Sequence, residues 1–145
     1  MQIRVRNYEV DWQGIVHNGN YLLYREVGRV EYLKHLGARV DLNSINNDAK
    51  VVLVRNEIDY RAPARFDELL NVYTRTAFIH DSSFMMEGIL ENASTKQLIA
   101  ENKAYHVWLD PTTAKSRRVP DKFRSLVRKY EGSNCDIQST AVRPI

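Results

Sequence analysis

The stretch that decides the fold is residues 8–36, which read YEVDWQGIVHNGNYLLYREVGRVEYLKHL. It begins as a short loop that contains one carboxylate, Asp11, and two glycines, Gly14 and Gly19, which can adopt backbone conformations closed to other residues. Asn18 and Asn20 are both candidates to cap a long helix that follows this loop. A helix N-terminus exposes unpaired N–H groups and partial positive charge. The pattern therefore predicts an oxyanion site about one helical turn from a carboxylate.

The predicted helix is apolar around most of its circumference. Its apolar residues do not fall on one stripe at 100° per residue; they are Tyr21, Leu22, Leu23, Tyr24, Val27, Val30, Tyr32, Leu33 and Leu36. A helix of this kind is normally buried, so we expect a central helix wrapped by other elements. Glu26 and Arg29 are spaced to form a local ion pair. Gly37 is a stop signal for the helix.

The remaining periodicity predicts strands and one further helix. Alternating or β-branched runs indicate five strands, over residues 3–8, 51–60, 69–80, 84–90 and 98–109. Residues 41–50 form a polar connector, and Pro120 opens a second helix over residues 121–130. Short turns between consecutive strands give an antiparallel sheet, and a five-stranded sheet curled about a long central helix is the α+β hotdog fold.

Length and composition limit the domain organisation and the function class. The chain has 145 residues, 43% of them hydrophobic and 27% charged, which suits one soluble domain over residues 1–130. Residues 131–145 lack periodicity and are expected to be a mobile C-terminal tail or a partner-dependent arm. A net charge of +3 is too small to indicate nucleic-acid binding, and no segment indicates a membrane protein. The single cysteine, Cys135, excludes an internal disulfide, and neither a metal site nor a cofactor is expected. A cytoplasmic location is the default, because the N-terminus lacks an apolar signal segment.

A family resemblance rests on several of these motifs. The run from Asp11 to Tyr21, with Tyr24, Glu26, Arg29 and Glu31, resembles the signature of the 4-hydroxybenzoyl-CoA thioesterase family of hotdog proteins. The resemblance continues through residues 58–68, through Ser82, Ser83 and Phe84, and through Thr113, Lys115 and Pro120. It covers nearly all of residues 1–130. It implies hydrolysis of an acyl thioester, with an acyl-CoA or an acyl-carrier protein as substrate.

The resemblance also implies roles for individual residues. Asp11 matches the catalytic carboxylate, as nucleophile or as general base for water. The backbone N–H groups near Asn18 and Gly19 match the oxyanion position. Substrate-binding candidates are His17, Tyr21, Tyr60, Arg61, Arg65, Ser82, Arg117 and Arg118. The sequence departs from the family at two places: many relatives have histidine where this chain has Asn18, and a basic triplet that binds CoA phosphates in one branch corresponds here to His80, Asp81 and Ser82.

Each of these assignments has a simpler structural alternative. Asp11 can be a turn residue, His17 a loop residue that only forms hydrogen bonds, and Arg117 with Arg118 part of a solvated loop. At the level of function, the alternative to a thioesterase is a non-catalytic acyl-thioester-binding or scaffold protein of the same fold. A hotdog dehydratase would need a different acid–base pair on the helix. The unpaired edge of the sheet predicts a homodimer or homotetramer, with residues 59–65 contributed to the partner's site.

Overall fold

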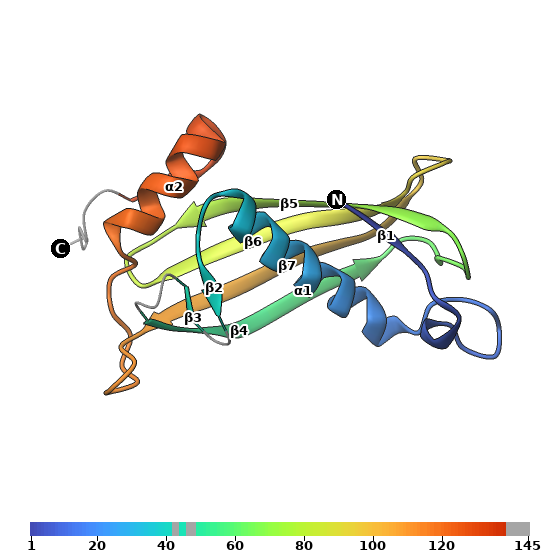
Figure 1. Cartoon of the computed structure of the whole chain (residues 1–145), viewed down its shortest axis with the longest axis horizontal. Coiled ribbons are helices and arrows are strands. Elements are labelled where there is room, and N and C mark those ends of the chain that lie inside the picture. Colours follow the sequence, from blue (N-terminus) through green and yellow to red (C-terminus); the bar gives the residue numbers. More distant parts are fainter. Residues whose placement is uncertain (42–43, 46–48, 139–145) are drawn as a thin grey trace. The chain divides into compact units, whose positions relative to one another are not determined.

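The computed structural model describes residues 1–41, 44–45 and 49–138 (Figure 1). Two α-helices occur in these residues, α1 (Asn18–His35) and α2 (Asp121–Glu131), with two short 3-10 helices, η1 (Asn7–Glu9) and η2 (Gly132–Asn134). The strands are β1 (Gln2–Arg4), β2 (Val40–Asp41), β3 (Ser44–Ile45), β4 (Ala49–Tyr60), β5 (Leu69–Ile79), β6 (Ser83–Asn92), β7 (Leu98–Leu109) and β8 (Asp136–Ile137). All five predicted strands and both predicted helices are present.

The described strands form one sheet in the order β1-β5-β6-β7-β4-β3-β2, and β8 pairs with β5. The sheet therefore has eight strands, and the prediction of five was wrong. Three strands of two residues were missed, because a pair of residues is too short to show a period. β8 also runs parallel to β5, with Phe78 opposite Asp136, whereas β1 pairs with β5 antiparallel.

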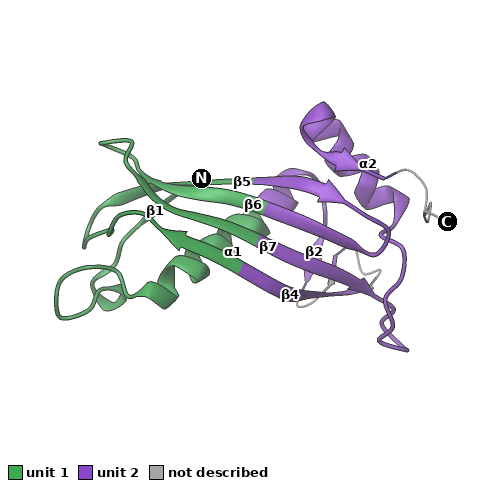
Figure 2. Cartoon of the chain, turned by 180° about the vertical axis from the view of Figure 1, so that it is seen from behind, with its two compact units in different colours: residues 1–31, 57–74, 87–103 green, residues 32–56, 75–86, 104–145 purple. Residues whose placement is uncertain are grey.

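The chain divides into two compact units (Figure 2). Each unit has its own core. The first consists of residues 1–31, 57–74 and 87–103, and its core includes Val5, Tyr21, Leu70 and Leu90. The second consists of residues 32–56, 75–86 and 104–145, and the core of its described part is built around Phe84, Trp108 and Phe123. In the second core the ring centroids of Trp108 and Phe123 lie 5.2 Å apart.

α1 is buried on one face only, so the prediction of burial all round was wrong. Leu23 and Val27 are 60% and 45% exposed, whereas Arg25 and Arg29 are 0% and 3% exposed. The buried positions, which include Tyr21, recur every three to four residues and make one helical stripe. Apolar content alone did not show which side of the helix faces the sheet.

The buried Arg25 guanidinium is held by α1, β5 and β6 within the first unit. Its Nη1 donates to the Tyr73 carbonyl at 2.6 Å, while Nε and Nη2 have no hydrogen-bond partner among the described residues. A Cβ added at Gly88 would lie 1.8 Å from the Tyr73 carbonyl oxygen and 2.3 Å from Arg25 Nη2. Only glycine fits at this point of β6. Burial, followed by the nearby Arg29 charge, lowers the pKa of Arg25 to about 10.

Local signals at the ends of α1 and after α2 had different outcomes. Gly37 has φ +94°, and the Ala38 N–H donates to the Leu33 carbonyl at 3.0 Å, so the predicted helix end is confirmed. After α2, residues 132–138 are not the expected mobile segment: Cys135 is buried and Ile137 packs against the second core. Residues 139–145, and residues 42–43 and 46–48 of the connector, lie outside the described residues.

Neither helix in the described part of the chain is long and apolar enough to cross a membrane.

Candidate active site

Asp11 lies at a tight hairpin in the first unit. Val10 and Val16 form a β-bridge, the Asp11 N–H donates to the Ile15 carbonyl at 2.9 Å, and the Gly14 N–H donates to the Asp11 carbonyl at 3.0 Å. Gly14 has φ +79°, the left-handed conformation that glycine adopts without strain. The hairpin thus holds the Asp11 backbone on both sides.

The Asp11 carboxylate already has one structural role. Its Oδ1 accepts a hydrogen bond from the Gln13 N–H at 2.8 Å, which is the turn interaction typical of aspartate. The side chain is partly exposed, and its second oxygen has no hydrogen-bond partner among the described residues. The turn interaction therefore uses one oxygen of Asp11 and leaves the other without a hydrogen bond among the described residues.

Main-chain and side-chain hydrogen bonds fix this hairpin to the start of α1. The Glu9 carbonyl accepts from the His17 N–H at 3.0 Å and from Asn20 Nδ2 at 2.8 Å. The Val16 N–H donates to the Ala64 carbonyl at 2.8 Å. Asn20 thus lies inside the helix and links it to η1. Glu9 was not singled out from the sequence, because its carbonyl, a group present in every residue, makes these contacts.

The first N–H groups of α1 differ in their partners. The Gly19 N–H donates to His17 Nδ1 at 3.2 Å, and the Asn20 N–H donates to the His17 carbonyl at 2.9 Å. The Asn18 N–H has no acceptor in the part of the chain that the structure describes. His17 is the N-cap residue, the position predicted for asparagine. Gly19 is an ordinary helical residue, so its expected special backbone conformation was wrong.

Two tyrosines line the same end of the first unit. Tyr60 Oη donates to the Asn18 carbonyl at 3.2 Å, and the Tyr21 and Tyr60 ring centroids lie 5.5 Å apart. The Tyr21 hydroxyl accepts from the Ala64 N–H at 3.0 Å. Burial raises the pKa of Tyr21, and the negative charge of Asp11 adds a smaller contribution in the same direction. Tyr21 and Tyr60 therefore lie together beside the start of α1.

The two predicted arginines of this unit are exposed and have different partners. Arg61 Nε and Nη2 donate to Glu101 Oε2 at 3.1 and 2.9 Å, and Asp59 lies 3.9 Å away. The Arg65 N–H donates to Glu68 Oε1 at 2.6 Å, and residue 65 forms a β-bridge with Ile15 of the hairpin. Arg65 is therefore tied directly to the Asp11 hairpin, while the charge of Arg61 is paired with carboxylates.

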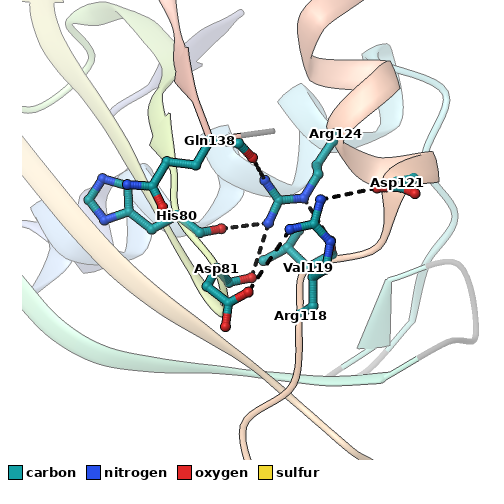
Figure 3. A network of polar contacts seen from close by, with 7 residues as sticks. All are labelled: His80, Asp81, Arg118, Val119, Asp121, Arg124 and Gln138. Atoms are coloured by element: carbon teal, nitrogen blue, oxygen red, sulfur yellow. Dashed lines mark hydrogen bonds and ion pairs between the residues drawn. The ribbon is translucent and has the colours of Figure 1, made fainter. Parts of the chain in front are cut away.

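The other predicted substrate-binding residues lie in the second unit. The Ser82 carbonyl accepts from the Trp108 N–H at 2.8 Å, so this residue lies in the β5–β6 turn and is attached to β7. Arg117 Nη1 lies 4.0 Å from Asp110. Arg118 lies 4.0 Å from Asp81 and 3.4 Å from Asp121 (Figure 3). Both arginines thus have carboxylate neighbours.

Arg124, a residue not singled out from the sequence, organises the segment around Arg118 (Figure 3). Its guanidinium is buried and donates to the backbone carbonyls of His80, Asp81, Val119 and Gln138. Burial lowers the pKa of Arg124. This arginine joins α2 to the β5–β6 turn and to the residue after β8. Nothing in its sequence neighbourhood distinguishes it from an exposed helical arginine.

The described residues contain no group of three or more histidines, cysteines, aspartates or glutamates arranged to hold a metal ion.

Comparison with known proteins places the chain in a family. Residues 5–127 match the family model described as the thioesterase-like superfamily. The chain is 29% identical over 133 residues to the chloroplastic acyl-acyl carrier protein thioesterase ATL2 of Arabidopsis thaliana, covering 91% of this chain and 67% of that protein. It is 26% identical over 130 residues to the acyl-CoA thioester hydrolase YbgC of Escherichia coli, covering 89% and 92%.

A solved structure agrees with the sequence matches. The thioesterase of Thermus thermophilus, crystallised with coenzyme A and Zn, superposes with a TM-score of 0.75 at 28% identity, covering 90% of this chain and 94% of that one. The chain therefore belongs to the thioesterase-like superfamily and has its hotdog fold. It is a thioester hydrolase.

Proposed function

We propose that Asp11 and the Asn18 N–H together carry out the hydrolysis of an acyl thioester by this enzyme. The proposal is carried by two groups on connected elements: a hairpin carboxylate with one unpaired oxygen, and the first N–H of α1, which has no acceptor among the described residues. The hairpin and the helix start are linked through Glu9, so both groups are held before a substrate arrives. Preorganised donors of this kind stabilise the oxyanion that forms when a carbonyl is attacked.

Two routes use the same groups. In the first, the Asp11 carboxylate attacks the thioester carbon, the thiolate leaves, and water hydrolyses the resulting mixed anhydride. In the second, Asp11 removes a proton from water, the hydroxide attacks the same carbon, and the thiolate leaves and takes up a proton. In both routes the carbonyl oxygen becomes negative, and the Asn18 N–H with the positive end of the α1 dipole stabilises it.

The test of this proposal is Asp11→Asn. We expect loss of more than nine-tenths of turnover with a fold stability close to wild type, because a partly exposed loop side chain leaves no core cavity. Turnover above a tenth of wild type would refute the catalytic role. A single turnover in ¹⁸O-labelled water then tests the first route: an unlabelled first product shows that Asp11 attacked and that water then added to the Asp11 carboxyl carbon. General-base catalysis gives only labelled product.

For the substrate, we infer an acyl thioester of coenzyme A or of an acyl-carrier protein, following the 4-hydroxybenzoyl-CoA thioesterase pattern within the superfamily. Support comes from relatives named for each of these carriers. Arg117 and Arg118 are the candidates for binding CoA phosphates, since a phosphate makes closer charge-assisted contacts than their surface carboxylate neighbours do. Replacing both with alanine should raise KM for acyl-CoA and leave kcat almost unchanged. An unchanged KM would remove them from the binding site.

We also infer that the chain forms at least a homodimer, through the edge of β4. Among the described residues, β3 covers only Ala49 and Lys50 of this edge, while Leu53 and Val54 are exposed. A long edge with exposed apolar residues is a surface that pairs with another copy. Light scattering at micromolar concentration should give twice the chain mass or more, and a monomer there would contradict this inference.

A further inference from the structure

His17 is linked to two of the first three N–H groups of α1, through two different atoms. Its ring atom Nδ1 accepts from the Gly19 N–H at 3.2 Å, and its carbonyl oxygen accepts from the Asn20 N–H at 2.9 Å. The N–H groups of a first helical turn have no partner inside the helix, so each needs an acceptor from elsewhere. His17 therefore accepts the hydrogen bonds of both the Gly19 and the Asn20 N–H groups.

The N–H group that His17 does not satisfy is that of Asn18. Asn18 lies between His17 and Gly19 in the sequence, and no described residue accepts a hydrogen bond from its N–H. If the His17 ring did not accept from the Gly19 N–H, the Asn18 and Gly19 N–H groups would compete for one substrate oxygen. The contact of His17 with Gly19 thus selects a single donor.

The hydrogen bonds of His17 also fix where that donor lies. The His17 N–H donates to the Glu9 carbonyl, which additionally accepts from Asn20 Nδ2 at 2.8 Å. The residue before the helix and the third residue of the helix are therefore attached to the same oxygen. A ring nitrogen that accepts a hydrogen bond from the Gly19 N–H carries no proton itself.

We propose that His17 is a positioning residue for the hydrolysis. Its ring and carbonyl occupy the Gly19 and Asn20 N–H groups, so that the Asn18 N–H is the one donor left to the thioester carbonyl oxygen, in a fixed direction. This inference rests on the proposed function, because it assigns the Asn18 N–H to the oxyanion. His17 touches neither the substrate nor the reacting atoms in this role. It acts through the first turn of the helix.

The test compares His17→Ala with His17→Asn. Asparagine is a strong N-cap and accepts the same N–H through its side-chain oxygen, whereas alanine cannot. We expect kcat to fall about tenfold in the alanine variant, with a smaller change in KM, and to recover to within about threefold in the asparagine variant. Equal kcat in the alanine variant and in wild type would overturn the proposal, and so would failure of asparagine to restore kcat while the protein stays folded.

A matched control separates positioning from loss of stability. Thr95 Oγ1 accepts from the Gln97 N–H at 3.2 Å, so Thr95→Ala removes a comparable hydrogen bond, two residues apart, from the β6–β7 turn. This variant should lower the urea midpoint and leave kcat as in wild type. If it lowers kcat as much as His17→Ala does, the effect of His17 is only on stability and the proposal fails.

A double-mutant cycle tests whether His17 acts through Asn18. Asn18→Pro removes the Asn18 N–H, and in that background His17→Ala should have no further effect on kcat. Additive losses would overturn the proposal. The result is distinguishable from failure of the proposed function, which would appear as an active Asp11→Asn variant whatever the behaviour of His17.

Discussion

Replacing Asn18 with proline removes one N–H group and little else. Asn18 is the first residue of α1, and its N–H has no partner among the described residues, so no hydrogen bond of the folded chain is lost. Proline is favoured at the first helical position, because its fixed φ suits a helix and its missing N–H is not needed there. The preceding residue is restricted to extended conformations, which is the usual conformation of an N-cap residue such as His17. The Asn18 carbonyl, which accepts from Tyr60 Oη, is retained.

The expected change in stability is therefore small, within about 1 kcal/mol of the free energy of unfolding. The expected change in rate is large. Loss of one oxyanion donor lowers kcat by about 100-fold to 1000-fold, which corresponds to about 3–4 kcal/mol of transition-state stabilisation. KM should change little, because the donor is matched to the charge that develops in the transition state and not to the neutral carbonyl.

The assay is release of free thiol from a panel of acyl-CoA substrates, followed with a thiol reagent, alongside urea unfolding. Asn18→Ala is the matched control, since it loses the same side chain and retains the N–H. We expect the alanine variant to keep kcat within about threefold of wild type and the proline variant to lose it. A folded proline variant with kcat close to that of the alanine variant would refute the assignment of the oxyanion to this N–H.

Two further predictions concern the packing of Arg25. Gly88→Ala should destabilise the fold by about 3 kcal/mol or more, because the new Cβ meets the Tyr73 carbonyl, a backbone atom that cannot rotate away; an unchanged urea midpoint would contradict the packing at this strand. The folded-state pKa of Arg25, about 10, lies below its ordinary 12.5, so the charged group destabilises the fold at neutral pH, and this cost is relieved only as the pH rises above about 10. Arg25→Met should therefore raise the free energy of unfolding at pH 7 by about 1–2 kcal/mol, despite the lost hydrogen bond to the Tyr73 carbonyl. If urea titrations instead show that this free energy falls by more than about 2 kcal/mol, the guanidinium has a stabilising partner.

Much of the fold was predictable because the signals are local. The run 98–109 has an alternating pattern, and β7 occupies those residues. α1 ends at His35, close to the predicted stop at Gly37, whereas its N-cap is His17 and not the predicted asparagine. The turn predicted after β6 depends on Asn92, whose side chain accepts two N–H groups within three residues. Each of these features is decided by residues a few positions apart, so the sequence pattern contains the physical cause.

The candidate site was predictable in part for the same reason. Six residues, 12–17, separate Asp11 from the start of α1, and the left-handed Gly14 lets Val10 pair with Val16 in the hairpin. The sequence pattern did not predict that the His17 ring would accept the hydrogen bond of the Gly19 N–H. The alternative caps of a helix differ in side-chain rotamer, which the sequence does not show. Arg124 and its four carbonyl partners were missed, since those partners lie up to 44 residues away in the chain.

The sequence by itself determined where the long strands and helices lie along the chain. It also determined that the Asp11 carboxylate stands in a loop just before the start of a helix. Only the tertiary structure decided that Arg25 and Arg29 face inward while Leu23 and Val27 face outward. The apolar residues surround the helix, so no periodicity distinguishes its two sides. Which side packs against the sheet depends on the space that the strand residues leave, and Gly88 leaves space for the Arg25 guanidinium. The same holds for the free N–H of Asn18, which is defined by the acceptors that its neighbours find and not by any property of asparagine.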